Sequence, residues 1–125
     1  MGGHVIRLYA RKEFKTLGHK DRHKKGEPMR EKVIEQKLVR AVKRAGGLAV
    51  KFTSPGFDGM PDRLVILPKG LITFIEVKAT GLKPRPLQVK RHEMLRGLGC
   101  RVFVLDDERQ IPALMIKIMR GGDAT

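Results

Sequence analysis

The chain has 125 residues, which fits one domain, and no stretch approaches the roughly 20 consecutive apolar residues that cross a bilayer, so we expect no membrane partner. Its single cysteine, Cys100, excludes an intrachain disulfide and a thiolate metal cluster, and fits a reducing, cytoplasm-like compartment. It carries 27 Lys and Arg against 13 Asp and Glu, for a net charge of +14. A domain this basic usually binds a polyanion, so nucleic acid is the partner we expect.

Residues 1–28 differ in composition from the rest of the chain. They hold eight basic residues against three acidic ones, and residues 18–26 contain no apolar side chain. Such a segment cannot bury surface, so we predict a basic, flexible N-terminal extension at 1–28 and a folded domain at 29–125. The extension is either a disordered segment or an arm that contacts DNA, and both interpretations stay open.

The remainder of the chain alternates between helical and strand patterns. Apolar residues at helical spacing follow Pro28, and Gly46 and Gly47 end this first helix. The expected elements, in the order α-β-β-β-α-β-α, lie at residues 28–45, 48–52, 63–67, 71–78, 87–98, 101–105 and 111–119. In the second helix, we expect four side chains to face inward: Leu87, Met94, Leu95 and Leu98. The pattern predicts a single α/β domain with a mixed central sheet flanked by helices.

Charged residues interrupt the predicted strand pair at three positions. Asp62 stands where a turn-rich loop meets the strand at 63–67, and Glu76 and Lys78 are two residues apart, so their side chains leave the same face of the next strand. The tight turn at 68–70 folds Asp62 back toward Glu76, because both lie a similar distance from it. Two carboxylates beside a lysine suit a hard cation and a water molecule to be activated. The alternative is a structural salt bridge between Lys78 and one of the carboxylates.

The first predicted helix adds a carboxylate on its inner side. Glu35 lies three residues before Leu38 and seven before Val42, so it points with the core-facing side of the helix. A third inward carboxylate would give the cluster more negative charge than Lys78 alone offsets, and a divalent cation would resolve the excess. Glu31, one turn earlier on the same side, is the competing candidate for this position.

The run from Gly59 to Arg63 (Gly-Met-Pro-Asp-Arg), followed by Phe74 to Ala79 (Phe-Ile-Glu-Val-Lys-Ala), resembles the PD-(D/E)xK nuclease signature. With the upstream helical glutamate and the downstream Gln88, it is more narrowly similar to the VRR-NUC (virus-type replication-repair nuclease) family. The resemblance covers about residues 29–120, and the predicted element order agrees with the αβββαβ core of that fold. It implies a metal-dependent DNA endonuclease that acts in the cytoplasm, or in the host cytoplasm if the protein is viral.

The resemblance also implies roles for individual residues. The implied ligands of Mg²⁺ or Mn²⁺ are the side chains of Glu35, Asp62 and Glu76 and the main-chain carbonyl of Val77. Glu35 would complete the site directly or through water. Lys78 would orient or help deprotonate the attacking water and stabilise the negative charge that develops on the phosphate. Gln88 would position Lys78, water or phosphate, unless it is an ordinary solvated helix residue.

A group of basic residues after the Glu-Val-Lys run suits the phosphates of DNA, or else forms a solvated helix face: Lys83, Arg85, Lys90, Arg91 and Arg96. Trp is absent and the five Phe look largely like core residues, so we do not expect single-strand binding by base stacking. Small members of the family resemble Holliday junction resolvases, which implies a homodimer that cuts branched DNA in repair or recombination. Two alternatives stay open: a non-catalytic DNA-binding protein with a structural Asp-Glu-Lys cluster, and a nonspecific or restriction-like nicking nuclease.

Overall fold

The computed structural model describes residues 29–121. The N-terminal extension predicted for residues 1–28 lies outside the described residues, as do residues 122–125. The helices and strands along the chain are α2 (Glu31–Arg44), β1 (Leu48–Lys51), β2 (Arg63–Leu67), β3 (Leu71–Val77), α3 (Pro86–Gly97), β4 (Val102–Leu105) and α4 (Ile111–Arg120). The predicted α/β class and the order α-β-β-β-α-β-α are confirmed.

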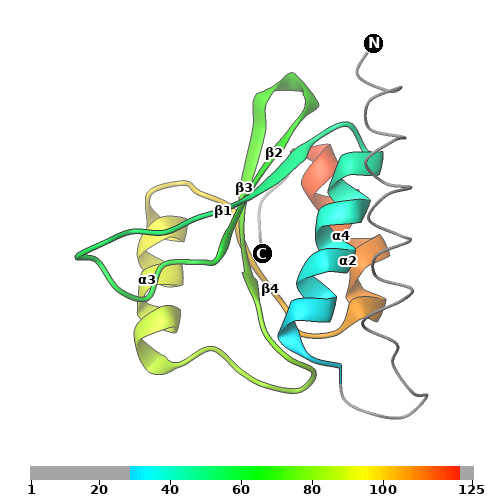
Figure 1. Ribbon diagram of the computed structural model, residues 1–125. Helices are drawn as coiled ribbons and strands as arrows, with labels where there is room; N and C mark the ends of the chain where they lie inside the picture. Colours follow the sequence, from blue (N-terminus) through cyan, green and yellow to red (C-terminus); the bar gives the residue numbers. More distant parts are fainter. Residues whose placement is uncertain (1–28, 122–125) are drawn as a thin grey trace.

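The four strands form one mixed sheet in the order β1-β2-β3-β4. β2 pairs antiparallel with both β1 and β3, whereas β3 pairs parallel with β4. Antiparallel neighbours need only a short connection, while a parallel pair needs a crossover, and α3 supplies it. In Figure 1, α2 and α4 lie on one side of the sheet and α3 lies on the other.

The main core lies between the sheet and the layer of α2 and α4. Successive strand side chains point to opposite faces, so alternate residues of β2 and β3 meet the apolar stripe of α2. The most deeply buried members of this core include Ile34, Leu38, Val42, Val65, Leu67, Ile75, Val77, Leu105 and Ile118. Val77 stands between Glu76 and Lys78, so the core anchors the middle of the Glu-Val-Lys run and turns its two charged neighbours to the other face.

α3 meets that other face along a stripe that is largely polar. Its buried residues are Gln88, His92 and Leu95, which lie on one side of the helix at i, i+4 and i+7. The prediction that four apolar side chains face inward is confirmed for Leu95 but wrong for the other three, which are exposed: Leu87, Met94 and Leu98. An apolar pattern selects the wrong side of α3, because Gln88 and His92 turn toward the buried Glu76 of β3.

Candidate active site

Asp62 and Glu76 face each other at one end of the β2–β3 pair. Arg63 pairs with Ile75 in the antiparallel register, so the next residues outward, Asp62 and Glu76, stand opposite each other. The Val77 N–H donates a hydrogen bond to Asp62 Oδ2 at 3.1 Å, which holds the Asp62 carboxylate against β3. The hairpin therefore brings together the two carboxylates that the sequence analysis assigned to the site.

The two carboxylate oxygens of Glu76 have different surroundings, although the residue as a whole is fully buried. Oε2 accepts a hydrogen bond from Gln88 Nε2 at 3.0 Å and lies 3.4 Å from Lys78 Nζ. Oε1 has no hydrogen-bond partner among the described residues. The side chain of Lys78 is 15% exposed, so its ammonium group links the buried Glu76 to the surface. Gln88 is a buried residue that contacts Glu76, not a solvated helix residue.

His92 contributes to the site and was missed by the sequence analysis. It is 2% exposed, and its Nε2 atom lies 3.6 Å from Glu76 Oε1. Within residues 29–121, Nε2 has no hydrogen-bond partner. Gln88 and His92 are four residues apart and so lie on the same side of α3. This polar pair within one helix was the signal available in the sequence.

Negative charge accumulates around Asp62. Burial and then the neighbouring Glu76 raise the pKa of Asp62 to about 6 from its ordinary value of 3.8, although the hydrogen bond from Val77 acts in the opposite direction. A carboxylate in a partly desolvated site beside a second carboxylate is disfavoured in its ionised form. Lys78 offsets only one of the two negative charges, so the arrangement favours the arrival of a further positive charge.

The two helical carboxylates, Glu31 and Glu35, have different partners. Arg63 Nε donates to Glu35 Oε2 at 2.8 Å, and both side chains are only 15% exposed. Arg63 therefore balances the charge of Glu35, a pairing that the sequence analysis did not consider. Glu31 instead interacts with the charges of the cluster. Burial raises the pKa of Glu31, and the nearby Lys78 acts in the opposite direction. A metal-binding role for Glu35 stays a prediction, as does one for Glu31.

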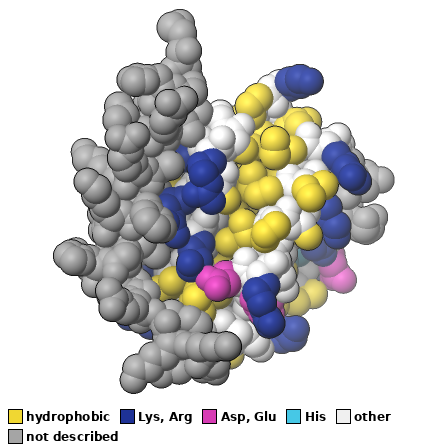
Figure 2. Space-filling model, turned by 90° about the vertical axis from the view of Figure 1, so that its right-hand side faces the viewer, with side chains coloured by type: hydrophobic (Ala, Val, Ile, Leu, Met, Phe, Trp, Pro, Cys, Tyr) yellow, Lys and Arg dark blue, Asp and Glu magenta, His cyan; other side chains and the backbone are white. Residues whose placement is uncertain are grey.

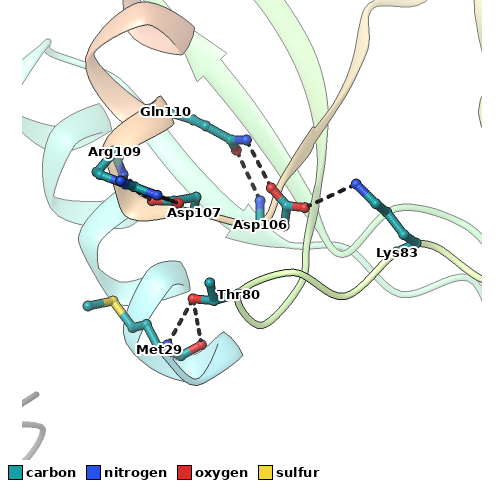
Figure 3. A network of polar contacts seen from close by, with 7 residues as sticks. All are labelled: Met29, Thr80, Lys83, Asp106, Asp107, Arg109 and Gln110. Atoms are coloured by element: carbon teal, nitrogen blue, oxygen red, sulfur yellow. Dashed lines mark hydrogen bonds and ion pairs between the residues drawn. The ribbon is translucent and has the colours of Figure 1, made fainter. Parts of the chain in front are cut away.

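Hydrogen bonds between Met29 and Thr80 hold the chain just before α2 against the segment that follows β3. Thr80 Oγ1 accepts a hydrogen bond from Met29 N at 2.8 Å and donates one to Met29 O at 3.2 Å (Figure 3). Thr80 N also donates to Met29 O at 3.0 Å. Glu31 lies two residues after Met29, and Lys78 lies two residues before Thr80. The contact therefore keeps Glu31 close to Lys78 and to the carboxylate pair.

A divalent cation is compatible with this donor set. Within residues 29–121, no group of three or more His, Cys, Asp or Glu side chains is arranged to hold a metal ion. Mg²⁺, however, usually keeps several waters and is bound through one or two carboxylates together with substrate phosphates. Asp62 and Glu76 supply two carboxylates. A nearby positive charge would lower the raised pKa of Asp62 and would give a partner to Glu76 Oε1, which has no hydrogen bond within residues 29–121. The residues present therefore fit such an ion.

The basic residues that were expected to contact DNA divide into two groups. Arg91 Nε and Arg96 Nη2 each donate to a main-chain carbonyl at 2.8 Å, so these two side chains support the fold around α3, although Arg96 is also exposed. Lys83 is 82% exposed in its side chain and lies 3.8 Å from Asp106 (Figure 3), and Arg85 and Lys90 are also exposed. The exposed group remains accessible to a polyanion.

Known proteins resemble this chain in both sequence and structure, although no family model matches it. The chain is 52% identical over 80 residues to "Putative nuclease p44" of Acyrthosiphon pisum secondary endosymbiont phage 1, a match that covers 64% of this chain and 86% of the relative. A solved structure described as a VRR_NUC domain matches with a TM-score of 0.67 at 38% identity, covering 69% of this chain and 94% of that one. This chain belongs to the VRR-NUC nuclease family.

Membership confirms the resemblance read from the sequence and gives the carboxylate pair a context. VRR-NUC nucleases typically use a divalent metal ion. The residues that correspond to the family signature, Asp62, Glu76 and Lys78, are the ones that meet at the end of the β2–β3 hairpin. Within the part of this VRR-NUC chain that the structure describes, no helix is both long enough and apolar enough to cross a membrane.

Proposed function

We propose that this VRR-NUC nuclease is an endonuclease that hydrolyses phosphodiester bonds in DNA and requires Mg²⁺ or Mn²⁺. The observation that carries the proposal is the pairing of Asp62 with the buried Glu76. Oε1 of Glu76 has no hydrogen bond within residues 29–121, and Oε2 lies 3.4 Å from the ammonium group of Lys78. Paired carboxylates select a hard divalent cation. The net charge of +14 favours a nucleic acid over smaller phosphodiesters.

The residues of the pair act on different parts of the reaction. Asp62, Glu76 and the main-chain carbonyl of Val77 would hold the ion, which when bound polarises the phosphate and lowers the pKa of a water molecule. Lys78 orients that water or donates to the phosphate oxygen on which negative charge develops. Its position is fixed by Glu76, because Lys78 Nζ lies against Glu76 Oε2.

Gln88 and one helical glutamate support this arrangement. Gln88 is a positioning residue, since its Nε2 atom donates to Glu76 and keeps that carboxylate turned toward Asp62. Of the two helical glutamates, we favour Glu31 to complete the ion site, directly or through water. Glu35 is already bound to Arg63 at 2.8 Å, whereas the pKa of Glu31 is raised by burial and by the neighbouring carboxylates.

We propose branched DNA as the substrate and a homodimer as the active form. α4 is apolar on both sides, because its inner residues are buried while Ile116 and Met119 are 56% and 50% exposed. The outer side of α4 also carries Lys117 and Arg120. Large exposed apolar residues on a helix whose inner side is already buried often mark a contact with a second partner. Apolar side chains gather between basic ones on the α2–α4 side of the molecule (Figure 2). A second copy bound there gives two active sites about a twofold axis, as two symmetric cuts in a four-way junction require.

The experiment that tests the function compares labelled four-way junction, flap and duplex DNA of matched sequence, with Mg²⁺, with Mn²⁺ or with a chelator. We expect cleavage only with a divalent ion, faster cleavage of the junction than of the duplex, and no cleavage by Asp62→Asn. Wild-type protein that cuts none of these DNAs with either ion refutes the nuclease. Equal rates on all three support nonspecific nicking instead.

The dimer has its own test in sedimentation velocity. Ile116→Glu introduces a charge into the exposed apolar face of α4 and should convert a dimer into a monomer. Leu98→Glu is the matched control, because Leu98 is 77% exposed at the end of α3, outside that face. A wild-type monomer, or a dimer that both variants retain, rejects this interface.

A further inference from the structure

Phe57, in the loop between β1 and β2, is the single aromatic residue among the exposed large apolar side chains of residues 29–121, with 39% exposure. The sequence analysis expected the phenylalanines to lie largely in the core, and for Phe57 this expectation is wrong. The ring stands close to a cation, since the guanidinium carbon of Arg91 lies 3.9 Å from its centroid. One face of the ring is thus covered by Arg91, and part of the residue remains exposed to solvent.

Several contacts hold this loop firmly against α3. Arg91 Nε donates to the carbonyl of Asp58 at 2.8 Å, and Phe57 N donates to the carbonyl of Ser54 at 3.1 Å. Gly59 has a φ of +90°, and a Cβ there would stand 2.9 Å from Leu87 Cγ and 3.0 Å from Arg91 Cγ. Only glycine tolerates this conformation and this close approach. The ring of Phe57 is therefore presented on a fixed backbone, which lowers the entropic cost of binding to it.

The Phe57–Arg91 pair is connected to the active site through both chain segments that form it. Arg91 follows Gln88 by three residues on α3, a rise of about 4.5 Å along the helix axis, and Gln88 contacts Glu76 directly. On the other chain segment, the loop runs from Phe57 through Pro61 into Asp62. The ring surface and the carboxylate pair are therefore linked through this loop and through α3.

We propose that Phe57, supported by Arg91, is a stacking platform for a nucleobase that has lost a stacking neighbour, at a branch point, a nick or a strand end. The inference rests on the proposed DNA endonuclease and names the feature of the DNA that the site selects. Every base offers a flat π-face, so such a platform does not read sequence. An intact duplex keeps its base faces stacked inside and offers the platform nothing. Preference for interrupted DNA then follows without any base-edge contact.

The first test uses Phe57→Trp, because the chain contains no tryptophan and the new indole reports only on this position. Fluorescence is measured in a chelator, so that binding is observed without cleavage. We expect strong quenching by a four-way junction or a nicked circle, and little quenching by a closed circular duplex that is also bound. Equal quenching by the interrupted and the closed DNA overturns the proposal.

The second test separates stacking from packing of the loop. Phe57→Leu keeps an apolar side chain but removes the π-face, and should lower the ratio of junction affinity to closed-duplex affinity by about 10-fold, the scale of one lost base–aromatic stack. Leu98→Ala, which also alters an exposed apolar residue at the other end of α3, should keep the wild-type ratio. An unchanged ratio in Phe57→Leu means that the residue only packs the loop.

The two proposals fail in different measurements. If the wild-type protein binds junction DNA selectively but never cuts it with Mg²⁺ or Mn²⁺, the endonuclease proposal is refuted and the stacking proposal stands. If the wild-type protein cuts DNA and Phe57→Leu keeps the full affinity ratio, the stacking proposal is refuted and the endonuclease proposal stands.

Discussion

Replacing Asp62 by asparagine removes a carboxylate whose ionisation the fold opposes. The pKa of Asp62 is raised from 3.8 to about 6 by burial and by Glu76, and each pKa unit corresponds to about 1.4 kcal/mol. The full shift would amount to about 3 kcal/mol. Because the Asp62 side chain is partly exposed, solvent screening reduces this, and we expect about 1–2 kcal/mol. Asparagine keeps an oxygen that accepts the Val77 N–H, so the variant should be more stable than wild type at pH 7 without divalent ions.

The pH dependence of this difference follows from the direction of the shift. Below the unfolded pKa of 3.8, Asp62 is protonated in both states, so its ionisation contributes nothing. Between about pH 4 and pH 6, the unfolded state releases the proton first, and the free energy of unfolding of the wild type falls as the pH rises. Above about pH 6 the penalty is complete. The advantage of Asp62→Asn should therefore be small near pH 4 and full at pH 7.

Thermal unfolding measured by circular dichroism at pH 4 and pH 7, in a chelator, provides the assay. For a domain of this size 1 kcal/mol shifts the Tm by about 4–8 °C, so Asp62→Asn should melt at least about 4 °C above wild type at pH 7. Asp58→Asn is the control, because Asp58 is an exposed residue of the preceding loop. Mn²⁺ should raise the Tm of the wild type and have little effect on Asp62→Asn. A variant that melts below wild type at pH 7, or with the same difference at both pH values, refutes the reasoning.

Three further substitutions test the other contacts of the site. Lys78→Ala should lower the single-turnover cleavage rate by about 10²-fold or more, because a positioned cation is lost. The Tm of this variant should still rise with Mn²⁺, because the carboxylates remain. A loss of about 3–5 kcal/mol of stability without an effect on cleavage would instead support a structural salt bridge. Gln88→Leu removes the amide that orients Glu76, so the Mn²⁺ concentration that gives half the maximal rate should rise by about 10-fold or more, and an unchanged value contradicts the positioning role. Arg63→Met should destabilise the fold by about 3 kcal/mol, since it leaves the carboxylate of Glu35 without its cation. Adding Glu35→Gln should restore most of the lost stability, measured by chemical denaturation. Additive losses would contradict the pairing.

Much of the fold was predictable because its determinants are local. The apolar spacing of α2 and the alternation of β2 and β3 each depend on a short window of sequence. The meeting of Asp62 and Glu76 was also predictable, since a tight turn fixes the register of a hairpin and the side-chain period of a strand is two. The basic character of the chain and the position of Glu76 and Lys78 on one face of a strand could be predicted from the sequence alone.

The errors arose where a side chain contacts a residue that is distant in the sequence and lies on another element. Gln88 and His92 are buried because Glu76 is buried opposite them. Their spacing marks one polar side of α3, but no window of α3 shows that this side faces a buried carboxylate. Arg63 balances Glu35 although the two residues are 28 positions apart, so charge counted around Lys78 alone overstated the excess. Phe57 is exposed in a loop and contacts Arg91 of α3, and this contact between distant parts of the sequence could not be read from a local pattern.

The central claim, that the carboxylate pair holds the ion that cleaves DNA, is tested most directly by two substitutions of glutamate by glutamine. Glu76 is buried against Gln88 and Lys78, whereas Glu93 lies exposed on α3. The measurement is the single-turnover cleavage rate of a labelled four-way junction at saturating Mn²⁺, with folding of each variant checked by circular dichroism. We predict that folded Glu76→Gln has no measurable cleavage and that Glu93→Gln cleaves at the wild-type rate. Cleavage by folded Glu76→Gln at the wild-type rate would contradict the account.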